Sequence, residues 1–143
     1  MAFGPDGSLY AGGDFDTAGG VTANYVARWD GTQWNSLGSG MDDLVYSLAV
    51  GPDGSLYAGG WFTTAGEVAA NHIARWDGAQ WHPLESGMNV SVDALAIGPD
   101  GLLYAGGWFT RAGEVAASRI ARWDGAQWLS LIHISEPTRR TPI

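Results

Sequence analysis

An internal repeat constrains this sequence more than any other feature. The tetrapeptide GPDG begins at Gly4, Gly51 and Gly98, so the repeat has a period of 47 residues. Over the 31 positions that begin with GPDG, the second and third copies agree at 27 positions, and the first and second copies agree at 24. Self-similarity at a fixed period of this length is typical of proteins that stack one supersecondary unit. The chain therefore carries three copies of such a unit.

Each copy is predicted to form four β-strands. In the second copy, the apolar run at residues 44–50 and the segment SLYAGG flank the GPDG turn, where proline and glycine favour a tight reversal. A polar, glycine-rich loop at residues 63–71 follows, and the segments HIARWD and QWHPL then form a second hairpin around an Asp-Gly turn. No window combines helical periodicity with an absence of glycine over about ten residues. The chain is therefore predicted to be all-β.

Four strands in about 40 to 50 residues is the period of a β-propeller blade. We therefore expect three four-stranded antiparallel blades of an incomplete β-propeller. Residues 1–50 would hold the first blade and the first strand of the second, 51–97 the rest of the second blade and the first strand of the third, and 98–131 the rest of the third. Residues 1–3 align with residues 48–50, so we expect the first strand of the first blade to be truncated. A β-trefoil, which also has three units of four strands, is the alternative.

The end of the chain departs from the repeat. After Trp128 the repeat predicts a Gly/Ser-Gly-Met linker, as at residues 38–41, but the chain continues as LSLIHISEPTRRTPI. The segment LSLIHISEPTR, residues 129–139, resembles the translation of a transposase-type sequencing adapter. We therefore expect a non-native tail at residues 132–143 that takes no part in the fold.

Two segments carry a resemblance to known propellers. The sequence LYAGG, which begins at Leu9, Leu56 and Leu103, resembles the di-glycine that follows a strand in kelch repeats. The segment LAVGPDGSLYAGG is similar to the first hairpin of NHL-type blades. Together they resemble kelch-like or NHL-like β-propeller repeat proteins of the bacterial secreted and surface type. The resemblance implies an extracellular or cell-surface location and covers residues 1–128.

Charge and composition exclude several classes of partner. The formal net charge is −8 and the chain has no lysine, so it would repel a phosphate backbone, and we expect no nucleic-acid partner. The apolar runs are far shorter than the roughly 20 residues of a membrane helix, so no membrane insertion is expected. The chain has no cysteine, and its histidines lack a second ligand at zinc spacing. We expect neither a metal site nor a cofactor.

Residues that recur in every copy are interpreted as structural. Arg28, Arg75 and Arg122 occupy the same position, and we expect each to bind a turn aspartate such as Asp77 or to stack on a tryptophan such as Trp76. A residue that every blade repeats is better explained by a recurring structural need than by one ligand site. No catalytic residue is predicted.

Residues that differ between copies are the better candidates for binding. Trp61 and Trp108 follow the di-glycine in the second and third copies, whereas the first copy has Asp14. An aspartate would be poorly tolerated at a position used only for packing, so we expect at least one of the two tryptophans to be partly exposed. Most other differences fall in the loop after this position, and loops on a rigid scaffold often carry recognition. The predicted ligand-binding residues are Trp61, Trp108, Glu67, Glu114 and Arg111.

These patterns predict a non-catalytic scaffold or recognition module for protein or carbohydrate within a larger extracellular protein. One alternative is a fragment of a propeller enzyme that acts on glycans, in which Glu67 and Glu114 would face one axis. A purely structural spacer is another. Because a propeller removes its sheet edges by closing a ring, we also expect the open chain to self-associate.

Overall fold

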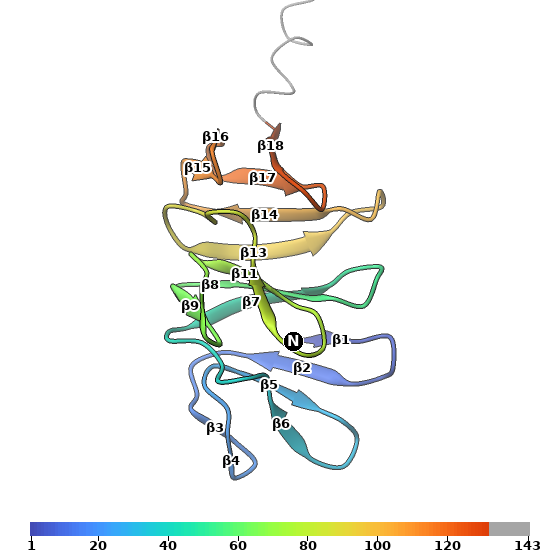
Figure 1. Cartoon of the computed structure of the whole chain (residues 1–143). Coiled ribbons are helices and arrows are strands. Elements are labelled where there is room, and N and C mark those ends of the chain that lie inside the picture. The colour runs from blue at the N-terminus through green and yellow to red at the C-terminus, as the bar shows by residue number, and fades with distance from the viewer. Residues whose placement is uncertain (132–143) are drawn as a thin grey trace, which may run out of the picture.

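Three four-stranded antiparallel sheets, one for each repeat, make up the fold (Figure 1). The computed structural model describes residues 1–131, so the predicted non-native tail at 132–143 lies outside the described residues. Blade 1 has the order β1 (Ala2–Phe3), β2 (Leu9–Gly12), β5 (Val26–Trp29) and β6 (Trp34–Ser36). Blade 2 has the order β7 (Val45–Val50), β8 (Leu56–Gly60), β11 (Ile73–Trp76) and β12 (Trp81–Pro83). Blade 3 has the order β13 (Val92–Ile97), β14 (Leu103–Gly107), β17 (Ile120–Trp123) and β18 (Trp128–Ser130).

The strand boundaries follow the sequence repeat. The second strands β2, β8 and β14 begin at Leu9, Leu56 and Leu103, and the other strands of blades 2 and 3 keep the same spacing. Each sheet is a meander of its own unit, with neighbouring strands paired in chain order. The structure therefore confirms the all-β blade prediction and excludes the β-trefoil alternative. Among residues 1–131, no helix is long and apolar enough to cross a membrane.

The segment between the second and third strands is more ordered than the sequence predicted. A plain loop was expected, but each blade forms a short hairpin there. These hairpins are β3 (Thr17–Ala18) with β4 (Val21–Thr22), β9 (Thr64–Ala65) with β10 (Val68–Ala69), and β15 (Arg111–Ala112) with β16 (Val115–Ala116). In blade 2, Ala65 is fully buried and forms a β-bridge with Met41 of the preceding linker. This contact ties the hairpin of blade 2 to the linker from blade 1.

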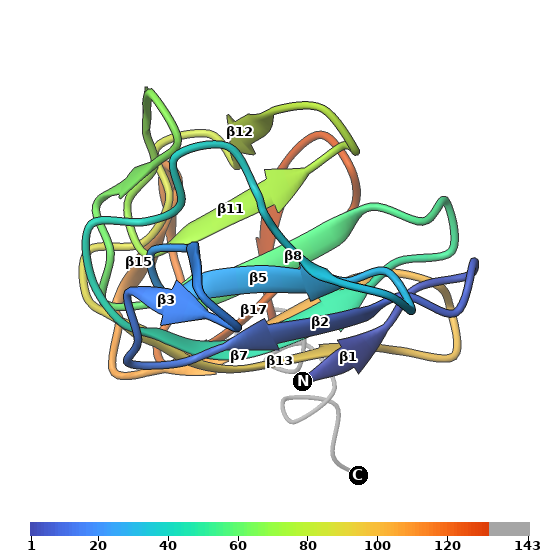
Figure 2. The same cartoon turned by 90° about the horizontal axis from the view of Figure 1, so that it is seen from below.

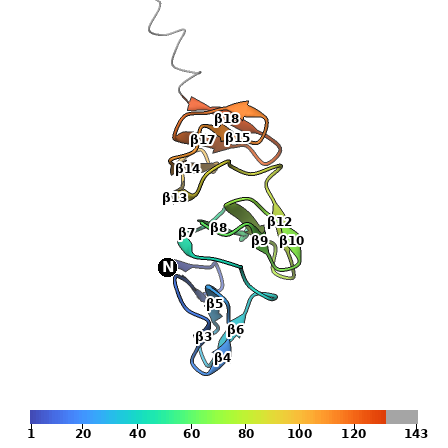
Figure 3. The ribbon, with the colours of Figure 1, turned by 90° about the vertical axis from the view of Figure 1, so that its left-hand side faces the viewer.

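The blades fan out from their first strands. In Figure 3 the strands β1, β7 and β13 lie close together, while the fourth strands of the three blades point apart. A view along the stack shows the three sheets overlapping with these first strands along one edge (Figure 2). The hydroxyl of Ser47 on β7 accepts a hydrogen bond from the backbone N–H of Leu95 on β13, at 3.0 Å. The first strands are therefore the inner strands of a β-propeller.

The hydrophobic core lies between blades. One cluster joins blade 1 residues such as Tyr10 and Val26 to blade 2 residues such as Leu56 and Trp81. A second cluster joins Ile73 and Leu84 of blade 2 to residues of blade 3. Strand side chains alternate between the two faces of a sheet, and blade 2 is covered on both faces. Each blade therefore stabilises its neighbours.

A tryptophan hydrogen bond closes each of these two interfaces. The indole Nε1 of Trp81 donates to the carbonyl of Leu37 at 2.9 Å, and that of Trp128 donates to the carbonyl of Leu84 at 3.2 Å. Both tryptophans begin a fourth strand, and both carbonyls lie just after the fourth strand of the preceding blade. Burial of an indole is favourable when its N–H finds such a partner. This contact explains why the second tryptophan of the repeat is constant.

The first glycine of LYAGG is required by the neighbouring blade. A Cβ added at Gly59 would lie 2.7 Å from Cγ1 of Val92, the first residue of β13. Gly12 meets Val45 of β7 in the same way, at 2.5 Å. At Gly106 in blade 3, the nearest atom to an added Cβ is 3.7 Å away, because residues 1–131 include no further blade that covers it.

Alanine substitution at Gly59 and at Gly106 should therefore have opposite consequences. Gly59→Ala forces Val92 to move and should lower the free energy of unfolding by about 1 to 3 kcal/mol. Gly106→Ala has space and should leave that free energy unchanged or raise it by up to about 1 kcal/mol, because alanine restricts the unfolded chain. Urea unfolding of both variants measures the difference, and equal effects would show that blade contacts do not select this glycine.

Candidate functional site

Trp61 and Trp108 line one open groove between blades 2 and 3. The groove has a volume of about 530 Å³, and its other lining residues are Tyr46, Ser91 and Asp93. The two tryptophan side chains are 52% and 65% exposed, whereas most tryptophans of the repeat are buried or half-buried. The prediction that at least one of them is partly exposed is confirmed. The groove lies at the ends of the blades that carry the small hairpins, opposite the GPDG turns.

A β-bulge places Tyr46 and Asp93 in the groove. In blade 2, Val45 pairs with Gly60 and Ser47 pairs with Gly59, so Tyr46 is an extra residue on the inner strand. Asp93 occupies the equivalent bulge in blade 3. A bulge disrupts the ladder locally and redirects a side chain. The tyrosine of one blade and the carboxylate of the next therefore reach the same groove from the same repeat position.

The backbone beside each tryptophan is held rigidly. The Trp61 N–H donates to the carbonyl of Leu44 at 2.9 Å, and the next residue, Phe62, is fully buried. The Asp42 carboxylate, in the linker from blade 1, accepts hydrogen bonds from the Thr63 and Thr64 backbone N–H groups at 2.8 and 3.0 Å. The exposed ring is thus fixed by a buried neighbour and by a clamp from the preceding linker.

Asn89 makes the corresponding clamp in blade 3. Its Oδ1 accepts hydrogen bonds from the backbone N–H groups of Thr110 and Arg111, at 3.0 and 3.1 Å. Its Nδ2 donates to the Thr110 hydroxyl at 2.9 Å, where Asp42 instead accepts from the hydroxyl of Thr63. The same geometry is therefore built with either a charged or a neutral side chain.

Aromatic and cationic neighbours orient the two exposed rings. Tyr46 packs edge-to-face on Trp61, with ring centroids 6.5 Å apart. In blade 3 the guanidinium carbon of Arg119 lies 5.1 Å from the centroid of the Trp108 ring, a cation–π geometry. Arg119 has a φ of 71°, in the left-handed region. With these contacts in place, more than half of the surface of each tryptophan residue stays open to solvent.

The chemistry of the groove is aromatic with one polar edge. The Ser91 hydroxyl lies 3.5 Å from Oδ1 of Asp93, so a hydroxyl and a carboxylate stand together beside the rings. Such a site can stack a flat apolar face and bind hydroxyl groups at its rim. Within residues 1–131, no group of three or more His, Cys, Asp or Glu side chains could hold a metal ion.

The structure does not bring the other predicted ligand-binding residues into this groove. Glu67 lies at the turn of the β9–β10 hairpin, which packs beside the outer strand β12, and Ser39 donates to its carboxylate at 3.3 Å. Glu114 lies at the equivalent turn of β15–β16, beside β18, and Arg111 is an exposed residue of β15. The propeller-enzyme alternative would have Glu67 and Glu114 face one axis, whereas their hairpins pack beside the outer strands β12 and β18.

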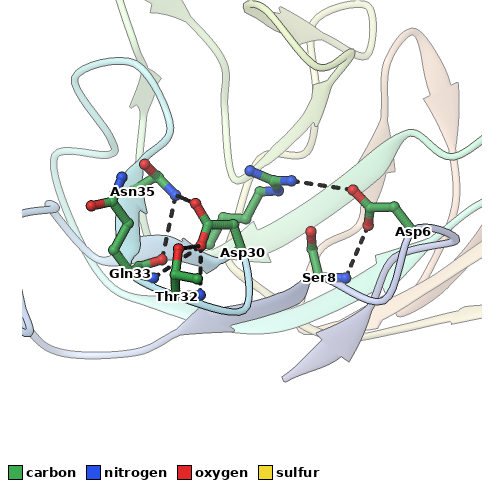
Figure 4. A network of polar contacts seen from close by, with 7 residues as sticks. Asp6, Ser8, Asp30, Thr32, Gln33 and Asn35 are labelled. Atoms are coloured by element: carbon green, nitrogen blue, oxygen red, sulfur yellow. Dashed lines mark hydrogen bonds and ion pairs between the residues drawn. The ribbon is translucent and has the colours of Figure 1, made fainter.

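The recurring arginines bind a turn aspartate, but the sequence suggested the wrong turn. Arg28 donates to Asp6 of its GPDG turn at 3.1 Å, in the network drawn in Figure 4. Arg122 lies 3.9 Å from Asp100, the equivalent aspartate of blade 3. The second and third strands are adjacent in each sheet, which places the arginine near the first turn rather than the second.

Arg75 reaches the same turn through a serine. It donates to the hydroxyl of Ser55 at 3.1 Å, and that hydroxyl donates to Asp53 at 3.1 Å. The Asp77 carboxylate, which was the expected partner, accepts from the backbone of its own Asp-Gly turn and contacts His82 at 2.7 Å.

The carboxylates of the second turn are structural caps. Asp30 accepts hydrogen bonds from the Thr32 and Gln33 backbone N–H groups and from the Asn35 side chain, as Figure 4 shows. These bonds, led by that of the Thr32 backbone, hold the pKa of Asp30 well below its usual range. Such carboxylates stay ionised and stabilise the turn, so they are poorly suited to acid–base catalysis.

Sequence reasoning missed Tyr46, Ser91 and Asp93. Tyr46 and Asp93 are equivalent positions of the repeat that differ in chemistry, which is the same signal that identified the tryptophans. They escaped notice because an unbroken strand would have been expected there, and only the bulge turns them outward.

Comparison with known families agrees with the architecture. The family described as "Domain of unknown function (DUF5122) beta-propeller" matches residues 4–29 and 51–76. The two matched segments run from the GPDG turn through the third strand of blades 1 and 2. No curated protein matches the chain. The matches and the repeated antiparallel sheets together show a β-propeller repeat protein.

The clamp beside Trp61 should make stability depend on pH in a defined way. Partial burial raises the pKa of Asp42, but the hydrogen bonds donated by Thr64 and Thr63 outweigh burial and hold the pKa below its usual value. A carboxyl with a lowered folded-state pKa stabilises the fold above its unfolded pKa of about 3.9. That contribution is lost as the pH falls through the folded pKa.

Asp42→Asn copies the residue used at Asn89 and removes this titration. The variant should stay within about 1 kcal/mol of the wild type at pH 7, because the amide can make the same hydrogen bonds. Below about pH 4 the variant should lose less stability than the wild type. Urea unfolding of the two proteins between pH 7 and pH 2 tests this, and parallel pH profiles would refute the role given to Asp42.

Proposed function

We propose that this chain is a non-catalytic recognition module of a β-propeller that binds carbohydrate in the groove between blades 2 and 3. The observation that carries the proposal is the pair of exposed indoles, Trp61 and Trp108, held on neighbouring blades beside the polar edge of Ser91 and Asp93. A secreted or surface location accords with the resemblance to kelch-like and NHL-like propellers. It would place the groove among extracellular glycans.

The geometry supports stacking of a sugar ring. Indole and phenol rings offer rigid, flat surfaces to the C–H face of a pyranose, and they lose little conformational entropy on binding. The Asp93 carboxylate and the Ser91 hydroxyl can bind sugar hydroxyls at the edge of such a stack. Tyr46 widens the aromatic floor by its contact with Trp61.

The same groove supports binding in preference to catalysis. Most glycoside hydrolases need two carboxyl groups that flank the scissile bond, about 5 to 10 Å apart. Among the described residues that line the groove, Asp93 is the only one with a carboxylate. Glu67 and Glu114 lie on the outer hairpins, so they do not complete such a pair.

A glycan array followed by fluorescence titration tests the proposal. The wild-type chain should bind a subset of glycans and change its tryptophan emission when they are added. Trp61→Ala and Trp108→Ala should each weaken binding at least about tenfold, which corresponds to about 1.4 kcal/mol. Asp14→Ala is the matched control, because Asp14 holds the same repeat position in blade 1 and does not line the groove.

Three outcomes would count against the proposal. Absence of any glycan that perturbs the fluorescence would remove carbohydrate as the ligand and favour a protein partner for the exposed rings. Equal binding by the wild type and both tryptophan variants would place the site elsewhere. Release of a hydrolysis product from a bound glycan would favour the propeller-enzyme alternative.

A further inference from the structure

Blade 3 exposes the face that blades 1 and 2 bury. Val26 and Ile73 begin the third strands of blades 1 and 2 and are fully buried, but Ile120 at the equivalent position is 39% exposed. On the same face, an added Cβ at Gly106 would meet only the Arg119 carbonyl, at 3.7 Å, where Gly59 meets Val92 at 2.7 Å. We call this surface the trailing face, meaning the face of a blade that the next blade covers.

Blade 1 exposes the opposite surface, which we call the leading face. Trp81 and Trp128 are 3% and 1% exposed, whereas their counterpart Trp34 is half-buried. Leu56 and Phe62 are fully buried in blade 2, but their counterparts in blade 1, Leu9 and Phe15, are also only half-buried. Phe3, whose strand partner is Leu9, is 72% exposed. Within residues 1–131, nothing covers the apolar leading face of blade 1 as blades 1 and 2 cover those of blades 2 and 3.

These two free surfaces are the two halves of an interface that the chain already forms twice. The ring of Pro5 packs on Gly54 and that of Pro52 packs on Gly101, in each case across a blade boundary and at 3.4 Å from an added Cβ. The repeat positions equivalent to these are Pro99 on the trailing face of blade 3 and Gly7 on the leading face of blade 1. Pro99 is exposed, as Pro5 and Pro52 are, but among residues 1–131 nothing lies within 4 Å of an added Cβ at Gly7.

We propose that copies of this chain associate head to tail, with the trailing face of blade 3 of one copy against the leading face of blade 1 of the next. The contact would repeat the internal blade interface, with Ile120 buried against Leu9 and Phe15. The indole N–H of Trp34 would donate to the carbonyl of Leu131, as Trp81 and Trp128 donate to Leu37 and Leu84. This inference does not rest on the proposed carbohydrate site.

Such a contact is heterologous, because it joins two different surfaces. After each addition the assembly still has one free leading face at one end and one free trailing face at the other, so it grows until a ring closes or continues as an open array. The surfaces are apolar, while the chain carries a formal net charge of −8. Added salt should strengthen association, because it screens the repulsion between copies.

Sedimentation velocity on the full chain and three glutamate variants tests the proposal. The wild type should shift to larger species over about a hundredfold increase in concentration. Ile120→Glu blocks the trailing face and Phe3→Glu blocks the leading face, so each variant alone should be monomeric. An equimolar mixture of the two should form a dimer, because one free face of each kind remains. Val90→Glu is the matched control: its side chain is 40% exposed in a linker, and it should associate like the wild type.

Several results would overturn the proposal. A wild type that stays monomeric throughout, also at high salt, would show that the open faces do not pair. Association of either blocked variant alone, or a mixture that remains monomeric, would show that the contact does not join these two faces. Circular dichroism checks the fold of each variant, and Pro99→Glu blocks the trailing face at a second exposed position should Ile120→Glu unfold.

Discussion

The structure depends on a hydrophobic core that lies between sheets. A single four-stranded sheet of this repeat has apolar residues on both faces, so it cannot bury them alone. In blade 2 both faces are covered by a neighbouring blade, and Leu56 and Ile73 are fully buried on opposite faces. The constant tryptophan of the fourth strand and the first glycine of LYAGG serve this packing directly. Neighbouring blades therefore stabilise one another, and the two outermost faces lack this stabilisation.

Because blade packing holds the strands, their ends are free to vary. Trp61 is flanked by a buried phenylalanine and a buried glycine, and a linker side chain clamps the following threonines. The indole ring itself contributes little to holding the fold together, which explains why blade 1 tolerates Asp14 at this position. Recognition residues mounted on a rigid scaffold are pre-organised, and less conformational entropy is lost when they bind a ligand.

Differences between copies predicted part of this site, but not its shape. Trp61 and Trp108 were found because their position changes chemistry between otherwise close copies. Glu67, Glu114 and Arg111 change or recur in the same loop, yet the short hairpins carry them to the outer edge of the blades. Sequence spacing does not reveal to which side of a sheet a loop folds back. The recurring arginines were recognised as structural, but their partner depended on which strands pair.

The sequence by itself determined the four sheet strands of each unit, the 47-residue spacing and the all-β class, because turn residues and apolar runs are local signals that repeat three times. Tertiary structure alone decided how the copies meet. The bulges that turn Tyr46 and Asp93 outward arise from pairing in the inner strands. The groove forms because two blades stand side by side, and the asymmetry between the leading and trailing faces exists only once the blades stack. The repeat pattern determines the fold of one blade, whereas the packing between blades determines which surfaces stay exposed.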